Sequence, residues 1–186
     1  MIRQGVALYQ NSEGNLDNFL DGAFQSLGIG YAKFHKMDRL SKLGFLASEV
    51  LLKDRALTTQ YAPEAVALVL SNSHSSLDTD IRYLESVKTM ASPALFVYTL
   101  PNIVAGEICI RQGIKGENAF FISETFDAGM ICDYVNMVMA TEKTQACIAG
   151  WVDVMDDHHD VFLYLVEKQG GTVALDHVPE QLLRLY

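Results

Sequence analysis

The segment richest in metal-binding side chains is Asp156-Asp-His-His-Asp160, which combines carboxylates with imidazoles. Both groups are common ligands of zinc and iron, so Asp157, His158, His159 and Asp160 form a candidate metal site. The ligands of one metal must point to one place, whereas consecutive residues point in different directions. We therefore favour a solvated turn before a strand, keep the metal site as the weaker hypothesis, and expect no cofactor.

A second candidate is the Ser-His-Ser-Ser run from Ser73 to Ser76, which holds the groups of a nucleophilic hydrolase. The run lacks a Gly-x-Ser-x-Gly turn and the sequence shows no acid partner, so a loop capped by hydroxyls is the simpler interpretation. The turn from Gly113 to Gly116 fits neither phosphate-binding pattern. Cys109, Cys132 and Cys147 lie among apolar residues, where thiols stay protonated, and core packing accounts for them.

A short basic cluster stands out in an otherwise acidic chain. The chain has 14 Lys and Arg against 23 Asp and Glu, a net charge of −9, which repels phosphate backbones and argues against a nucleic-acid partner. The cluster is suited to an acidic protein or a phosphate group, but a solvated helix face is the more common arrangement. Its members are Lys33, His35, Lys36, Arg39 and Lys42.

The hydrophobic pattern predicts the elements that position these residues. After Asp38, a plausible N-cap, apolar residues recur at helical spacing to about residue 51, and a continuous apolar run at 65–70 is typical of a strand buried on both faces. Strands alternating with helices predict an α/β layered fold. The further expected elements are strands at 5–9, 119–122 and 161–166, an apolar run at 147–154, helices at 77–90 and 103–112, a hairpin of 161–166 with 172–175 through a turn at 170–171, and a short tail at 181–186.

Residues 130–140 are apolar on nearly every face of a helix, which predicts a helix buried on all sides. Such a helix must be covered, either by the C-terminal hairpin folding back or by another chain.

Length and composition set the class of protein. A chain of 186 residues with 49% hydrophobic and 20% charged residues is the size of one compact domain, so we expect a single domain over 1–186. Three cysteines without a paired pattern indicate a reducing compartment. The first ten residues do not resemble a signal peptide, and no stretch is apolar enough for a membrane span. We therefore expect a cytoplasmic protein without membrane contact.

Residues 92–118 contain a specific motif. Pro101-Asn102 opens a helix that ends in Gly113-Ile-Lys-Gly116. This resembles the segment of the β-ketoacyl-acyl carrier protein synthases (ketosynthases) that precedes their active cysteine. The resemblance extends back through 36–43 and 65–80, and forward to 146–153, which is similar to the family's Leu-Ala-Gly-Gly-x-(Asp/Glu) strand. It implies the N-terminal half of a thiolase-like layered fold, with a mixed sheet and a buried helix, and acyl-condensing chemistry in fatty-acid or polyketide-type biosynthesis.

The resemblance also implies that the catalytic groups are missing. Where the family reads Thr-Ala-Cys-Ala-Ser-Gly, this chain reads Glu-Thr-Phe-Asp-Ala-Gly, and the anchor at Gly129 puts Phe126 at the position of the nucleophilic cysteine. Thr125 and Ser123 are the nearby hydroxyls, without a visible base. The half of the family's enzymes that carries two histidines has no counterpart, since His158 and His159 are adjacent and too early.

The resemblance therefore favours a catalytically inactive ketosynthase-like partner or scaffold subunit. It implies a homodimer, or a heterodimer with a full-length ketosynthase, with the strand at 119–122 as a pairing edge, and it offers an acyl carrier protein as a further partner. Two alternatives stay open. One is an acyltransferase or thioesterase that uses Thr125 or a site completed by a partner, and the other is an acyl-chain-binding module whose pocket is lined by Phe126.

Overall fold

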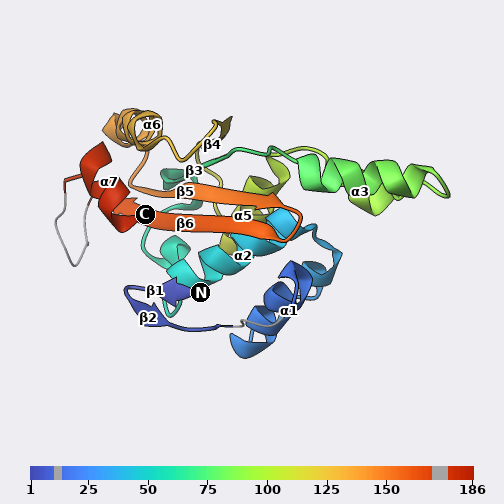
Figure 1. Cartoon of the computed structure of the whole chain (residues 1–186). Coiled ribbons are helices and arrows are strands. Elements are labelled where there is room, and N and C mark those ends of the chain that lie inside the picture. The colour runs from blue at the N-terminus through green and yellow to red at the C-terminus, as the bar shows by residue number, and fades with distance from the viewer. Residues whose placement is uncertain (11–13, 169–175) are drawn as a thin grey trace.

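The computed structural model describes residues 1–10, 14–168 and 176–186 and shows an α/β fold (Figure 1). A four-stranded mixed sheet lies between helices. The elements are β1 (Ile2–Arg3), β2 (Val6–Ala7), α1 (Leu16–Ser26), η1 (Ala32–Lys36), α2 (Arg39–Leu51), η2 (Leu57–Thr59), η3 (Pro63–Ala65), β3 (Val66–Asn72), α3 (Leu77–Val87), α4 (Pro93–Val97), α5 (Ile103–Gln112), β4 (Asn118–Ile122), α6 (Ala128–Ala140), β5 (Ala146–Met155), β6 (His158–Glu167) and α7 (Pro179–Leu185).

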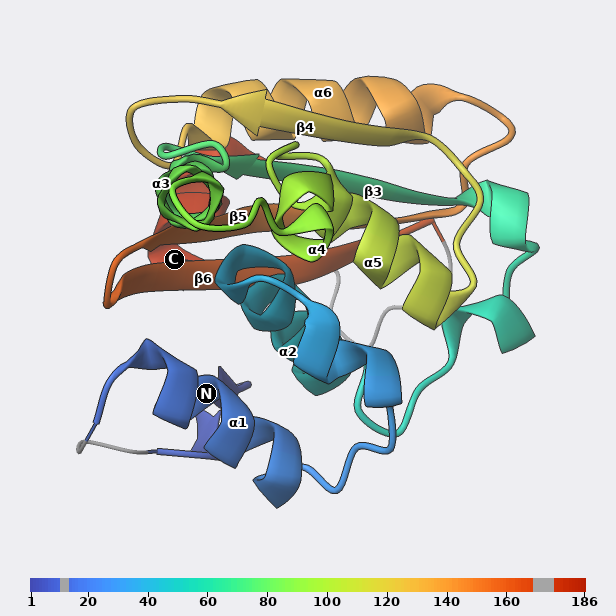
Figure 2. The same cartoon turned by 90° about the vertical axis from the view of Figure 1, so that its right-hand side faces the viewer.

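The sheet has the strand order β4-β3-β5-β6. Strand β3 runs parallel to both β4 and β5, and β6 is antiparallel to β5 (Figure 2). Every residue of β3 and all but the last residue of β5 are buried. Both apolar runs are therefore strands covered on both faces, which confirms the prediction at 65–70 and the strand that the resemblance implied at 146–153.

Alternate residues of the strands divide the interior into two cores. Leu68 and Leu70 of β3 join the core with α1, α2 and α5, whereas Ala67 and Val69 join the core with α6 and α7. The period of two along a strand sends neighbouring side chains to opposite faces. Figures 1 and 2 show α6 on one face of the sheet and α2 with α5 on the other.

Local signals set the boundaries of the helices that the sequence predicts. Asp38 caps α2 by accepting a hydrogen bond from the Ser41 backbone N–H at 3.0 Å. Helix α5 ends at Gly113, whose φ of +70° is the left-handed conformation of a helix C-terminus. A Cβ atom on Gly116 would lie 2.3 Å from the carbonyl oxygen of Val66. The glycines of this turn therefore serve close packing against the start of β3.

In the four-stranded sheet, β5 and β6 form an antiparallel hairpin. Ten residues of each strand are in register, from Ala146 opposite Glu167 to Met155 opposite His158. Gly150 has a φ of +148°, and a Cβ atom there would fall 1.9 Å from the Phe162 carbonyl oxygen, so only glycine fits. The predicted turn and strand at 170–175 lie outside the described residues.

Three sequence predictions were wrong in part. Helix α6 is not buried on all sides, because the sheet covers only one of its faces, and Asp133, Asn136 and Met137 are exposed. The predicted tail at 181–186 is mostly helix α7, which packs against α6 through Leu182. The expected strand at 5–9 is only the two-residue β2, paired with β1 outside the main sheet.

Residues 77–100, which we call the arm, extend from the body of the molecule (Figure 1). Of α3, only Asp78 and Thr79 in its first turn are buried. The helical stripe along α3 and its continuation through α4 carry exposed apolar side chains, namely Leu77, Ile81, Leu84, Val87, Met90, Phe96, Val97 and Leu100. No helix in the described ranges is long and apolar enough to cross a membrane.

Candidate functional site

The junction between β4 and α6 is the segment in which the ketosynthase resemblance places the nucleophile. Asp127 caps α6 by accepting a hydrogen bond from the Met130 N–H at 2.9 Å, and the Ser123 hydroxyl donates to the Thr125 carbonyl at 2.8 Å. The Thr125 residue is exposed, whereas Phe126 is only 6% exposed. An open pocket of about 410 Å³ lies here, lined by residues 123–129 together with Pro179 and Leu183 of α7.

Phe126 belongs to an aromatic cluster built from three parts of the chain. Its ring centroid lies 4.8 Å from Tyr186, 5.6 Å from Phe162 and 6.3 Å from Trp151. Burial and a hydrogen bond to Asp160 raise the pKa of Tyr186 to about 12, so this phenol is neutral. The position to which the ketosynthase resemblance assigns the nucleophile therefore holds a phenyl ring, which packs against side chains of β5 and β6 and against Tyr186.

The structure gives His74 the acid partner that the sequence does not show. The Asp153 carboxylate accepts a hydrogen bond from the His74 ring Nδ1 at 2.7 Å. It also accepts hydrogen bonds from the backbone N–H groups of Ser73 and His74 at 3.1 and 3.0 Å. Burial alone would raise the pKa of Asp153, but the hydrogen bonds from His74 and Ser73 outweigh it and hold that pKa below its ordinary value.

These three residues do not form a hydrolase triad. The Ser73 hydroxyl lies 2.9 Å from His74 Nδ1, the same nitrogen that contacts Asp153. In a triad the acid and the serine use opposite ring nitrogens, so that Nε2 removes the serine proton. Here the carboxylate fixes the loop after β3, and His74 Nε2 has no hydrogen-bond partner in the part of the chain that the structure describes.

Sequence reasoning missed Asp153 because it lies 79 residues from His74. The two residues meet because β3 and β5 are parallel neighbours whose carboxyl ends lie at the same edge of the sheet. The sequence signal of this contact is the polar run directly after β3 together with a carboxylate near the end of the apolar run that forms β5.

The candidate metal ligands at 157–160 have separate partners. The Asp157 carboxylate accepts a hydrogen bond from the Leu16 N–H at 3.1 Å, and the Asp160 carboxylate accepts one from the Tyr186 hydroxyl. His159 packs against Phe19 with ring centroids 5.3 Å apart. His158 is exposed at the start of β6. Across residues 1–10, 14–168 and 176–186, no three His, Cys, Asp or Glu side chains gather in a way that could hold a metal.

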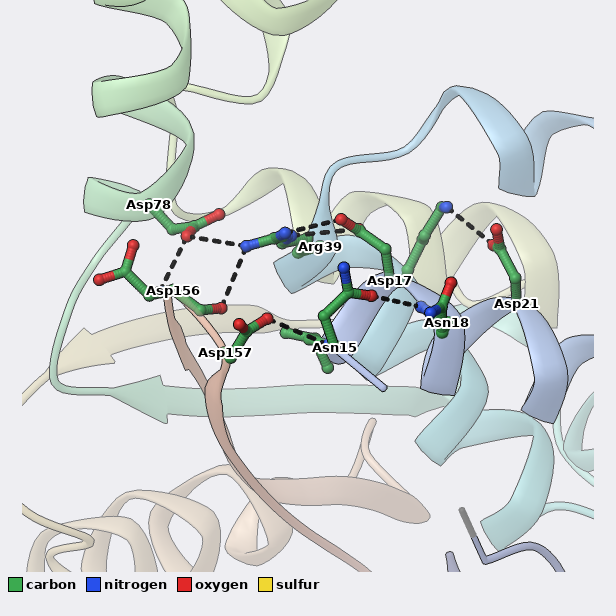
Figure 3. Close-up of polar contacts among 10 residues, drawn as sticks. Asn15, Asp17, Asn18, Asp21, Arg39, Asp78, Asp156 and Asp157 are labelled. Atoms are coloured by element: carbon green, nitrogen blue, oxygen red, sulfur yellow. Dashed lines mark hydrogen bonds and ion pairs between the residues drawn. The ribbon is translucent and has the colours of Figure 1, made fainter. Parts of the chain in front are cut away.

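The basic cluster is largely neutralised within the chain. Arg39 contacts Asp17 through two hydrogen bonds of 3.1 and 2.6 Å and donates to the Asp156 carbonyl at 3.1 Å (Figure 3). Its guanidinium also lies 3.6 Å from Asp78, so it joins α1 and α3 to the turn between β5 and β6. Lys33 and Lys42 pair in the same way with Glu107 and Asp21, at 2.7 and 3.0 Å. These ion pairs connect elements of the fold and leave little free positive charge for a docking partner.

All three cysteines are free and protonated. Burial raises the pKa of Cys109 to about 11 and that of Cys147 to about 12. Burial also raises the pKa of Cys132, whose Sγ atom lies 3.6 Å from His177 Nδ1 and 3.0 Å from the His177 carbonyl oxygen. The His177 ring contacts Asn136 at 2.7 Å, and burial lowers its pKa. This neutral Cys-His-Asn cluster, which the sequence did not reveal, attaches the start of α7 to α6.

Comparison with solved structures shows which known fold this chain shares. The chain is similar to a structure titled the ishigamide ketosynthase/chain length factor, with a TM-score of 0.58, 23% identity, and coverage of 69% of this chain and 38% of that chain. It is also similar to the ketosynthase ApeO in complex with its chain length factor ApeC from Xenorhabdus doucetiae, with a TM-score of 0.52, 14% identity, and coverage of 68% and 50%.

A third similar structure holds the type II PKS acyl-carrier protein AntF in complex with its ketosynthase AntDE bound to the hexaketide. It matches with a TM-score of 0.53, 18% identity, and coverage of 76% of this chain and 47% of that chain. No family model and no curated protein sequence matches. The chain therefore has the thiolase-like ketosynthase fold, and it spans between 38% and 50% of the length of these three structures.

Proposed function

We propose that this chain is a non-catalytic, ketosynthase-like partner subunit. The observation that carries the proposal is the side chain at position 126. A phenyl ring cannot attack a thioester, and its packing against Trp151, Phe162 and Tyr186 fills the space at the start of α6. The neighbouring hydroxyls do not replace it, because within the described ranges no imidazole hydrogen-bonds to Ser123 or Thr125.

Two features support a partner chain with the same fold. Strand β4 is at the end of the sheet, and its outer edge pairs with no strand among the described residues. Asn72 of β3 is in register with Ile122 of β4, and Ile122 is 58% exposed. The arm begins at residue 77, five residues after Asn72. A chain that added a strand to β4 would lie beside the exposed apolar side chains of the arm, so both surfaces fit one partner. The partner is a second copy or a full-length ketosynthase, and an acyl carrier protein would bind the assembled pair.

Sedimentation tests the partner role. At micromolar concentration we expect a dimer, either of this chain alone or with a ketosynthase copurified from the same cells. Leu84→Glu places a charge in the apolar stripe of α3 and should shift the protein toward monomer. Arg82→Glu, exposed on the other side of the same helix, is the matched control and should leave the dimer intact. A single 20.6 kDa species under all conditions, with no copurifying chain, contradicts the proposal.

A second candidate function is the binding of an acyl chain. The 410 Å³ pocket beside an aromatic cluster favours it, because Phe126, Pro179 and Leu183 give the pocket an apolar part close to solvent, next to its polar residues at 123–125 and 127. Mass spectrometry of native and delipidated protein tests it: a bound acyl compound present only in the native sample is expected, and identical spectra argue against this function.

A further inference from the structure

Two buried polar groups on the α6 side of the sheet lack partners. The Ser71 hydroxyl and the Trp151 indole N–H are each enclosed by protein, and neither makes a hydrogen bond within the described residues. Ser71 is 0% exposed and Trp151 is 4% exposed. The two residues are opposite each other in the register of β3 and β5, so their side chains start from adjacent points on the same face. Trp151 also contacts the ring of Phe126.

Unpaired groups of this kind are rare, because a buried donor without an acceptor destabilises the fold. Alanine at 71 would remove only the hydroxyl and would leave no donor unpaired at that position. Both groups can donate, so each of them lacks an acceptor. The surrounding side chains are apolar, among them Phe126 and Phe162, and burying a charged acceptor there would be unfavourable. A neutral oxygen, such as a carbonyl, satisfies both donors.

We propose that Ser71 and Trp151 together receive the carbonyl oxygen of an apolar acyl group that enters from the pocket at 123–129. The ring of Phe126 lines this pocket and also contacts the ring of Trp151, so it connects the pocket with the residue pair Ser71 and Trp151. Entry displaces this ring, together with Tyr186, whose side chain closes the cluster from the C-terminal end. The inference deepens the acyl-chain-binding function proposed above and rests on it, whereas the partner role is independent of it.

The experiment uses two ligands that differ at one group. S-octanoyl-N-acetylcysteamine carries a thioester carbonyl, and S-octyl-N-acetylcysteamine replaces that carbonyl with a methylene. Trp151 is the single tryptophan of the chain, so its fluorescence reports binding at this place. We expect a saturable change with both ligands and an affinity about tenfold higher for the thioester, the effect of one well-placed hydrogen bond.

Ser71→Ala should reduce the preference for the thioester severalfold. Trp151→Phe should abolish that preference, and calorimetry measures its binding because this variant lacks the fluorescent residue. Ser48→Ala is the matched control, because Ser48 is also fully buried but its hydroxyl donates to the Phe45 carbonyl at 2.8 Å. Ser48→Ala should leave the preference unchanged.

Stability gives a second readout that does not depend on ligand. Ser71→Ala should unfold at the same or a higher urea concentration than the wild type, because its hydroxyl has no bond to lose. Ser48→Ala should unfold at a lower one. Equal losses of stability in Ser71→Ala and Ser48→Ala would show that the Ser71 hydroxyl already makes a hydrogen bond in the free protein, and would overturn the inference. Equal binding of the two ligands would also overturn it while leaving the acyl-chain-binding function in place, and binding of neither would overturn both.

Discussion

Replacing Phe126 with cysteine tests whether this position lies at the open junction where a nucleophile would act. The ring is 6% exposed and contacts three aromatic neighbours, so its loss should lower the free energy of unfolding by about 3 kcal/mol. A domain of this size is commonly stable by about 5–15 kcal/mol, so the variant should remain folded. Urea unfolding measures this change.

The new thiol should then react far faster than the native ones. With pKa values of about 11 and 12, Cys109 and Cys147 are thiolates to only about one part in a thousand or less at pH 8, whereas an ordinary thiol of pKa about 8.5 is ionised to roughly a quarter. We therefore expect alkylation by iodoacetamide at least about 100-fold faster at position 126, followed by intact mass and peptide mapping.

Met137→Cys provides the reference for this reaction, because Met137 is exposed on α6, 58% by area. If the cysteine at 126 reacts as slowly as the native thiols in a protein that stays folded, the assignment of this junction as an accessible site is wrong.

Three further changes test the fold and the chemistry. Arg39→Ala should lower stability by about 2 kcal/mol at pH 7, measured in urea. Hydrogen bonds from Arg39 lower the pKa of Asp17. Their contribution to stability is therefore present above the ordinary Asp pKa and is lost as the pH falls through the pKa of Asp17 in the folded protein. The difference in unfolding free energy between the variant and the wild type should shrink below about pH 4. Gly150→Ala should lower the thermal midpoint sharply, since its Cβ would meet the Phe162 carbonyl; an unchanged midpoint would refute the close approach. Incubation with a labelled acyl thioester should give no stable adduct by intact mass in wild type or in Thr125→Ala, and an adduct that the substitution removes would establish the acyltransferase alternative.

Local pattern was enough to predict most of the elements. The apolar run at 65–70 is β3, Asp38 is the N-cap of α2, and Gly113 ends α5, because burial, capping and left-handed conformations each depend on residue types close in sequence. The motif at 92–118 also indicated the ketosynthase fold that the comparisons show. Helix α6 was misjudged, because its composition shows how apolar it is but not how many neighbours cover it.

The contacts at the candidate site depend on chain segments that are distant in sequence. Parallel pairing of β3 with β5 brings Asp153 to His74, and packing of the C-terminal residues brings Tyr186 to Phe126. The sequence gives the side-chain types at positions 126 and 74, and it therefore shows that position 126 carries a phenyl ring and no thiol. Which groups face each other, and which buried donors are left without an acceptor, is decided only when the sheet forms, because strand order and register set those distances.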